Sequence, residues 1–199
     1  MSEVIVPHDP GRGPLVGVRR MLVLSSIAGL EEVGLYDRYS AHIDSTTLTS
    51  ILEMIGPGWM PVELAKSHYE ACDRMQLTDA QIQEMGFRAG NKMSGSLLVA
   101  GTQAPGGTAE RSPWELVGAY SRMGRRIYEG SSSQYVKLGP NKLLIEHIGN
   151  PLFSIHYFRL AHSSFMRGTF RSLGVEIADV IYSPYRPDPP RIEARLAWK

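Results

Sequence analysis

The chain has 199 residues, 43% hydrophobic and 21% charged, which is typical of one globular domain with a single core. Lys and Arg number 21 against 20 Asp and Glu, so the net charge of +1 provides no general field to attract nucleic acid or an anionic membrane. A single cysteine excludes an internal disulfide, and no apolar run approaches the ~20 residues that cross a bilayer. We therefore expect a cytoplasmic protein without a nucleic-acid or membrane partner.

The first 43 residues carry few clear signals. Residues 1–14 contain three prolines and two glycines without hydrophobic periodicity, which predicts a flexible leader before a single domain over residues 15–199. Between Leu15 and Ile43, strand-forming and helix-forming residues conflict, and no element is assigned there. Asp44 or Ser45 can then cap a helix, which the Gly-Pro-Gly at 56–58 ends.

Two helices follow with stronger start signals. The first begins at Pro61, because proline suits a first helical position. Thr78 and Gln81 form a capping box, which opens a long helix over residues 79–100. Glycine is unfavourable inside a helix, so Gly86 and Gly90, one turn apart, indicate close approach of another backbone or of a ligand.

The second half alternates between strands and helices. A loop over 101–111, expected to act as a mobile gate, precedes a helix whose capping signal is the Ser-Pro-Trp-Glu at 112–115. A hairpin around residues 139–142, a helix over 155–173 and two strands complete the chain, with a proline-rich loop over 183–190. This order predicts an α+β fold, with a helical N-terminal half packed on a four-stranded antiparallel sheet of β-β-α-β-β C-terminal order.

Five segments of the sequence resemble segments of known proteins. The chain carries, in order, GWMPVELAKSHYEACD, LTDAQIQEMG, SPWELVGAYSRMGRRIYEG, GNPLFSIHYFRLAHSSFMRGTFRSLG and a terminal strand ending near Trp198. This layout resembles an uncharacterised family of bacterial paralogues expanded in myxobacteria. More distantly, it is similar to the superfamily that joins the vinyl-four-reductase small-molecule-binding domain with the haem nitric-oxide-binding domain. The resemblance implies a sensory pocket between helices and a four-stranded antiparallel sheet, in a regulatory module.

The chain departs from both branches of that superfamily. The haem-binding branch uses a Tyr-x-Ser-x-Arg motif with an axial histidine. The most similar segment here, residues 182–186, has the sequence Tyr-Ser-Pro-Tyr-Arg. The vinyl-reductase branch often carries cysteines near its C-terminal strands, and this sequence has none after Cys72. Neither haem nor zinc is therefore carried over from the resemblance.

His68 and Cys72 lie four residues apart and share a helix face, which makes them weak candidates for a metal or haem site. Zinc usually takes four ligands, and the sequence offers no second pair at ligand spacing. A Cys–His nucleophile is disfavoured, because Cys72 falls late in its helix, where the dipole opposes a thiolate. The favoured interpretation places both residues in an ordinary core.

A ligand pocket is expected where the long helix, the helix over 155–173 and the sheet meet. His162 has aromatic neighbours and is either a core histidine bonded to a carbonyl or a polar group that orients a small ligand. The six residues predicted to contact the ligand are Gly86, Gly90, Met93, Phe158, His162 and Phe165. A separate cluster, Arg122, Arg125 and Arg126, could hold an acidic partner surface, although such a cluster is usually a solvated face.

These observations favour a non-enzymatic regulatory or sensory domain that binds a small apolar or amphipathic ligand between helices and sheet. The alternative is a scaffold or oligomerisation module that retains no ligand and contacts a protein partner or a second copy. An enzyme using His68 and Cys72, or His162, is the third hypothesis. No P-loop, dinucleotide-binding glycine motif or metalloprotease signature supports it.

Overall fold

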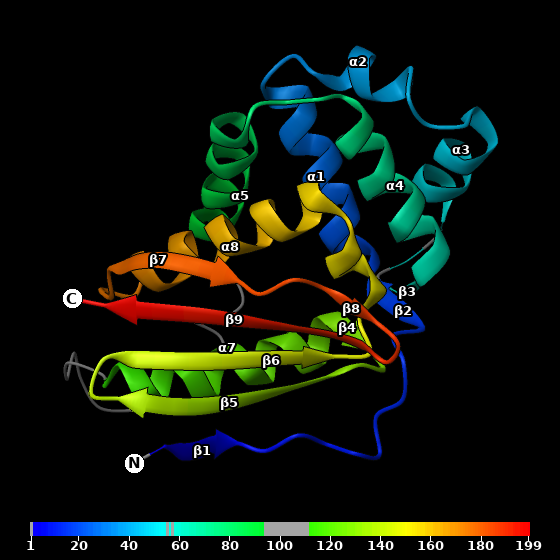
Figure 1. Cartoon of the computed structure of the whole chain (residues 1–199). Coiled ribbons are helices and arrows are strands. Elements are labelled where there is room, and N and C mark those ends of the chain that lie inside the picture. Colours follow the sequence, from blue (N-terminus) through cyan, green and yellow to red (C-terminus); the bar gives the residue numbers. More distant parts are fainter. Residues whose placement is uncertain (1, 55, 57, 94–111) are drawn as a thin grey trace.

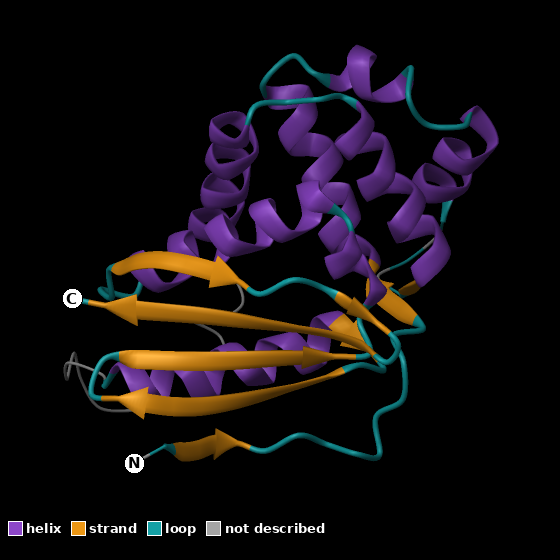
Figure 2. Ribbon diagram, in the orientation of Figure 1, coloured by secondary structure: helices purple, strands orange, loops and turns teal. Residues whose placement is uncertain are grey.

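The computed structural model describes residues 2–54, 56, 58–93 and 112–199. Figure 1 shows a helical half stacked against a twisted sheet, and Figure 2 separates the two by colour. The expected α+β class is confirmed. The end of the predicted long helix and the expected gate at 101–111 lie outside the described residues.

The main sheet is antiparallel and, within the described residues, has six strands. Its order is β1 (Glu3–Val6), β5 (Ser132–Gly139), β6 (Lys142–Ile148), β9 (Pro190–Trp198) and β7 (Ile177–Tyr182), with β8 (Arg186–Pro187) also pairing with β9. The four strands expected from the sequence form the contiguous part of this sheet. The prediction of four strands is corrected by the two short strands that the sequence did not reveal.

Both extra strands are short and lie in segments rich in proline or glycine. Strand β1 falls within the predicted leader and pairs with β5, and the nearby Arg12 side chain donates hydrogen bonds to the carbonyls of Gly130 and Ser131. Strand β8 falls within the proline-rich segment predicted to be a loop, and its pairing with β9 closes a tight hairpin. Backbone pairing with β5 and β9 therefore orders two short segments that were predicted to be a leader and a loop. The division into leader and domain stays a prediction.

Alternation along the strands decides which face of the sheet is buried. Tyr135, Ile145 and Ala194 lie side by side on β5, β6 and β9 and are buried, whereas Glu146 and Glu193 pair on the opposite face. Helix α7 (Pro113–Ile127) covers this buried face behind β5 and β6, as Figure 1 shows. The predicted alternation of the last strand is confirmed, because its residues Ile192, Ala194, Leu196 and Trp198 are all buried.

The remaining helices form the second half of the molecule. They are α1 (Arg20–Glu32), α2 (Tyr36–Ser40), α3 (Ser45–Glu53), α4 (Val62–Arg74), α5 (Asp79–Met93) and α8 (His156–Arg171), with a short 3-10 turn at Pro151–Ser154. A second sheet of β2 (Gly17–Arg19), β3 (Trp59–Pro61) and β4 (Tyr128–Glu129) holds the start of α1 near the ends of the larger elements. Helix α8 lies between the main sheet and these helices (Figure 1).

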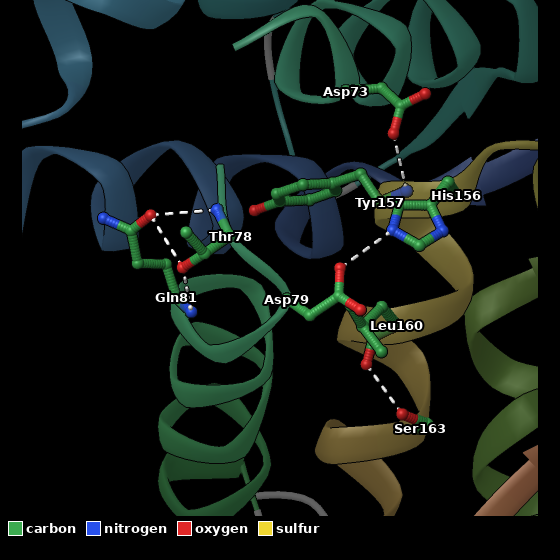
Figure 3. Close-up of polar contacts among 8 residues, drawn as sticks. All are labelled: Asp73, Thr78, Asp79, Gln81, His156, Tyr157, Leu160 and Ser163. Atoms are coloured by element: carbon green, nitrogen blue, oxygen red, sulfur yellow. Dashed lines mark hydrogen bonds and ion pairs between the residues drawn. The ribbon is translucent and has the colours of Figure 1, made fainter. Parts of the chain in front are cut away.

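Local capping signals explain where the helices begin. The Asp44 side chain accepts the Thr47 amide, and Thr78 and Gln81 form the predicted reciprocal box, with distances of 3.0 and 3.3 Å. Figure 3 shows this box beside a contact between helices, in which the Asp73 carboxylate accepts the Tyr157 amide at the start of α8. Because α8 has no cap in its own sequence, the end of α4 provides one.

Helices α5 and α8 pack with almost no space between their backbones. A Cβ built at Gly86 would overlap the carbonyl of Ala161, and one built at Gly90 would overlap that of Phe165. On the facing side, Gly168 of α8 meets the backbone of α5 in the same way. The glycines predicted to allow close approach therefore allow the approach of another helix, since no larger side chain fits there.

Candidate functional site

A cavity of about 400 Å³ lies between the helical half and the main sheet. Helix α1 lines it with Leu22 and Gly29, α5 with Met85 and Ala89, and α8 with Phe158. Helix α7 and strands β5 and β6 close the remaining sides. Most of the lining is apolar, and the volume falls in the range of small-molecule sites in proteins.

One side of the cavity is polar, and we call the residues Ser121, Ser133, Tyr135 and His147 the polar wall. The Ser121 and Ser133 hydroxyls lie near Tyr135 and lower its pKa against the larger, raising effect of burial, and the Ser133 hydroxyl lies 2.9 Å from Nδ1 of His147. The other ring nitrogen of His147, Nε2, is buried without a hydrogen-bond partner among the described residues. Burial lowers the pKa of His147, so its imidazole is neutral.

His162 also lines the cavity, but both of its ring nitrogens have partners. Nδ1 lies 2.7 Å from the Tyr182 hydroxyl and Nε2 lies 3.4 Å from the Tyr120 hydroxyl. Burial lowers its pKa to about 4, which keeps the ring neutral at physiological pH. The partners are tyrosine hydroxyls from other elements, so the expected bond to a carbonyl is replaced by side-chain bonds that fix the ring at the edge of the cavity.

Charged side chains border the cavity on two sides. On one side, Lys92 contacts the Glu32 carboxylate at 2.6 Å, and Arg88 contacts Glu84 at 2.7 Å. On the other side, the exposed Arg125 of α7 lies near Tyr135, whose pKa burial raises and the positive charge of Arg125 lowers.

The three arginines predicted to contact a partner differ in their position relative to the cavity. All three are exposed, but only Arg125 is among the described residues that line the cavity. The three positions still form one basic stretch of helix, and their role toward a protein partner stays a prediction. The structure adds that one of them borders the cavity.

His68 and Cys72 are completely buried in the helical half. Nδ1 of His68 lies 2.9 Å from the Tyr39 hydroxyl, Nε2 lies 3.0 Å from Ser26 Oγ, and Cys72 Sγ lies 3.8 Å from Nε2. Burial lowers the pKa of His68 to about 3 and raises the pKa of the Cys72 thiol, both of which favour the uncharged forms. These contacts support the core interpretation, because a metal ligand or a nucleophile needs an accessible lone pair or thiolate.

The six predicted ligand contacts divide into three groups. Gly86, Phe158, His162 and Phe165 line the cavity. Gly90 is in the interface between α5 and α8, so a leucine there is expected to separate the helices and would not remove a ligand selectively. Met93 is helical, but its side chain lies outside the described part of the chain.

Sequence reasoning missed helix α1 and the polar wall. A signal for α1 was present, because Val23, Ile27 and Leu30 recur at helical spacing and are all buried. The polar wall had no comparable signal, since its serines, tyrosine and histidine come from three separate elements. Their meeting depends on the pairing of β5 with β6 and on the placement of α7.

Neither a metal-binding cluster nor a membrane-spanning helix is found among the described residues. No group of three or more His, Cys, Asp or Glu side chains there is arranged to hold a metal ion. No helix in the described ranges combines the length and hydropathy needed to cross a bilayer.

Comparison with known proteins shows which of them share this fold. No family model and no curated protein matches the sequence. The fold is nevertheless similar to that of H-NOX domains, so the predicted distant resemblance to the haem nitric-oxide-binding domain is confirmed at the level of the fold.

Three solved structures illustrate this likeness. The H-NOX protein from K. algicida has a TM-score of 0.65 and 13% identity, covering 91% of this chain and 96% of that chain. An oxygen-binding H-NOX domain related to soluble guanylate cyclases has a TM-score of 0.57 and 11% identity, covering 91% and 95%. Subunit 3 of a trafficking protein particle complex from Naegleria fowleri, covalently bound to palmitic acid, has a TM-score of 0.55 and 15% identity, covering 69% and 94%.

The residues around the cavity do not reproduce the haem-holding set of the haem-binding branch. Haem iron commonly takes a histidine ligand; both nitrogens of His162 have hydroxyl partners, which leaves Nε2 of His147 as the one ring nitrogen without a partner among the described cavity residues. The segment nearest to the Tyr-x-Ser-x-Arg motif, residues 182–186, does not line the cavity. Tyr182 instead bonds to His162, and Arg186 is in the exposed strand β8.

Proposed function

We propose that this chain is a regulatory or sensory domain that binds a small apolar or amphipathic ligand in the cavity between the helices and the sheet. The observation that carries the proposal is the cavity itself, which is large enough for a small molecule, mostly apolar, and bordered by a few polar groups. The fold likeness gives further support, because H-NOX domains and the palmitate-bound trafficking subunit share this architecture.

The position of the cavity suggests how binding would be transmitted. Its lining comes from α1, α5, α7 and α8 as well as from the sheet, so a ligand contacts both halves of the molecule. A ligand that binds only when these helices and the sheet are packed around it stabilises that packed arrangement by its binding free energy. Regulation would then follow from ordering of helices that are less constrained when the cavity holds no ligand.

A neutral apolar fluorophore such as N-phenylnaphthylamine tests this proposal directly. We expect saturable fluorescence enhancement with the unchanged protein, and its loss in Ala89→Phe, whose larger side chain occupies the cavity. Ala178→Phe is the matched control, because Ala178 is exposed on β7 and does not line the cavity. Equal fluorescence with all three proteins, or none with any of them, would contradict the proposal.

The second candidate is the scaffold or oligomerisation module. It is favoured by exposed apolar side chains on the sheet and its edge strands, among them Val4 at 51% and Ile181 at 62% exposure. Val4 of β1 and Ile181 of β7 belong to the same cross-strand row, which runs through Val136, Leu144 and Arg195 on the face opposite the helices. A defined multimer that Ile181→Asp converts to monomer, with no fluorophore binding, would favour this alternative.

A further inference from the structure

The polar wall is a row of polar side chains in which one ring nitrogen lacks a partner. It consists of Ser121, Tyr135, Ser133 and His147, of which Ser133 and His147 are hydrogen-bonded, and each member is buried or half-buried. At its inner end, Nε2 of His147 has no partner among the described residues, although the side chain is only 7% exposed. A buried polar atom without a hydrogen bond costs about 1–3 kcal/mol, so a ligand atom that bonded there would remove this cost.

The charges around the cavity are not balanced on the side of the wall. Lys92 and Arg88 have carboxylate partners, so the opposite side is neutralised by ion pairs. On the side of the wall, the Arg12 guanidinium donates to three backbone carbonyls, and the Asp9 carboxylate accepts the Gly11 amide. Arg125 adds a positive charge there, and no ion pair joins it to a described carboxylate.

We infer that the ligand is an amphipathic carboxylic acid, with its apolar part in the cavity and its carboxylate beside Arg125 and Tyr135 on the polar wall. This inference rests on the proposed function and adds the chemical class of the ligand. An arginine matches the two oxygens of a carboxylate, and charge-assisted hydrogen bonds are the stronger ones. A phosphate head, with its larger charge, is usually held by a cluster of cations; Arg88 and Lys92 are ion-paired and the Arg12 guanidinium is directed to backbone carbonyls, so Arg125 is the cation placed to meet a singly charged head.

Three ligands of equal chain length separate charge from apolar contact. Calorimetric titration of the full chain at neutral pH would compare dodecanoate, dodecanol and dodecylamine. The apolar part is the same in all three, so differences in affinity report on the head group alone. We expect dodecanoate to bind about tenfold or more tightly than dodecanol, and dodecylamine to bind most weakly.

Two variants of one helix then assign the head-group site. Arg125→Ala should remove the preference for dodecanoate while leaving the affinity for dodecanol unchanged. Arg126→Ala is the matched control, because Arg126 is one position further along α7, is exposed and does not line the cavity. Tyr135→Phe should lower the affinity for dodecanoate by a smaller factor, since it removes one hydroxyl and no charge.

The outcomes distinguish this inference from the proposed function. Equal affinity for dodecanoate and dodecanol, or a preference that survives Arg125→Ala, would overturn the assignment of an acid and leave the apolar cavity intact. Failure of all three ligands to bind, together with failure of the neutral fluorophore, would overturn the proposed function itself. Selective loss in Arg125→Ala alone supports the inference.

Discussion

Two buried polar groups differ in whether their histidine nitrogens all have hydrogen-bond partners. They are the polar wall and the group of His68, Tyr39, Ser26 and Cys72, which we call the His68 cluster. In the His68 cluster, both ring nitrogens of His68 have hydroxyl partners, Tyr39 and Ser26, and Cys72 packs beside them. In the polar wall, His147 has one partner, Ser133, and one nitrogen without any. The His68 ring is enclosed by core residues, and its cluster reaches the cavity of about 400 Å³ only through Ser26, whereas His147 lines that cavity directly.

The difference between His68 and His147 shows that burial of a histidine does not by itself indicate a functional site. Both histidines are neutral because burial lowers their pKa values, and both contact aromatic rings. What distinguishes them is the missing partner and the adjacent space, which together indicate a position for a ligand atom. The following predictions test the contrast between packed and open regions, from the largest expected effect to the smallest.

Two glycine-to-alanine changes should have opposite effects on stability. Gly90→Ala should destabilise the protein by about 3 kcal/mol, because its Cβ would overlap the backbone of α8. Gly29→Ala, on α1 beside the cavity, should stabilise by about 0.5–1 kcal/mol, since a Cβ there meets open space and alanine favours the helix. Denaturant unfolding measures both, and a cost at Gly29 equal to that at Gly90 would refute the contrast.

The two histidines should also differ when each is replaced by leucine. His68→Leu should cost about 2–3 kcal/mol, because it leaves the buried Tyr39 hydroxyl and Ser26 without their shared partner. His147→Leu should cost about 1 kcal/mol or less, because it affects only Ser133 and also removes an unpaired nitrogen. Comparable costs for the two variants, measured by urea unfolding, would show that the wall is as complete as the cluster.

Acid should destabilise the protein through these buried histidines. The pKa of His68 is lowered to about 3 and that of His162 to about 4 in the folded state, against an ordinary value of 6.5. The unfolded chain therefore takes up protons below pH 6.5 that the folded chain does not, so stability falls as the pH decreases from 6.5 toward 4. Each such histidine contributes a slope of about 1.4 kcal/mol per pH unit in this window.

A variant isolates the share of His68 in that slope. His68→Gln can keep hydrogen bonds with Tyr39 and Ser26 but does not titrate, so it should reduce the slope of unfolding free energy by about 1.4 kcal/mol per pH unit. His42→Gln is the control, because the His42 side chain is exposed to solvent, and it should leave the slope unchanged. An unaltered slope in His68→Gln would mean that His68 is not held neutral in the folded protein.

Enlarging an alanine should give a smaller effect, which differs in size between the closed core and the cavity. Ala71→Val, in the closed core around His68, should destabilise by about 1–2 kcal/mol through overpacking. Ala89→Val, beside the cavity, should change stability by less than about 0.7 kcal/mol, because the added methyl groups enter open space. Thermal unfolding compares the two, and equal destabilisation would indicate that the region around Ala89 is already filled.

The sequence predicted those features that depend on local patterns. The capping box of Thr78 and Gln81, the cap at Asp44 and the alternation of the last strand each involve residues within a few positions of one another. Gly86 and Gly90 were recognised as points of close approach because glycine is unfavourable in a helix. Their partner, the backbone of α8, could not be identified from that local signal.

The rest depended on contacts between distant residues. Strand β1 pairs with β5 across about 130 positions of sequence, so its short Glu-Val-Ile-Val run did not reveal its partner. The polar wall unites a serine of α7 with residues of β5 and β6, so neither spacing nor periodicity marks it. His162 and Phe158 were predicted to border a ligand because they share one face of a strongly patterned helix, and both line the cavity.

The central claim is that the cavity retains a ligand, and native mass spectrometry of the purified protein tests it most directly. The masses of the folded and denatured protein would be compared for the unchanged chain and for Ala89→Phe, each alone and after addition of dodecanoate. We expect added mass on the folded unchanged chain that denaturation removes, and none on Ala89→Phe. A bare mass for the unchanged chain even with dodecanoate, or equal added mass on Ala89→Phe, would contradict this account.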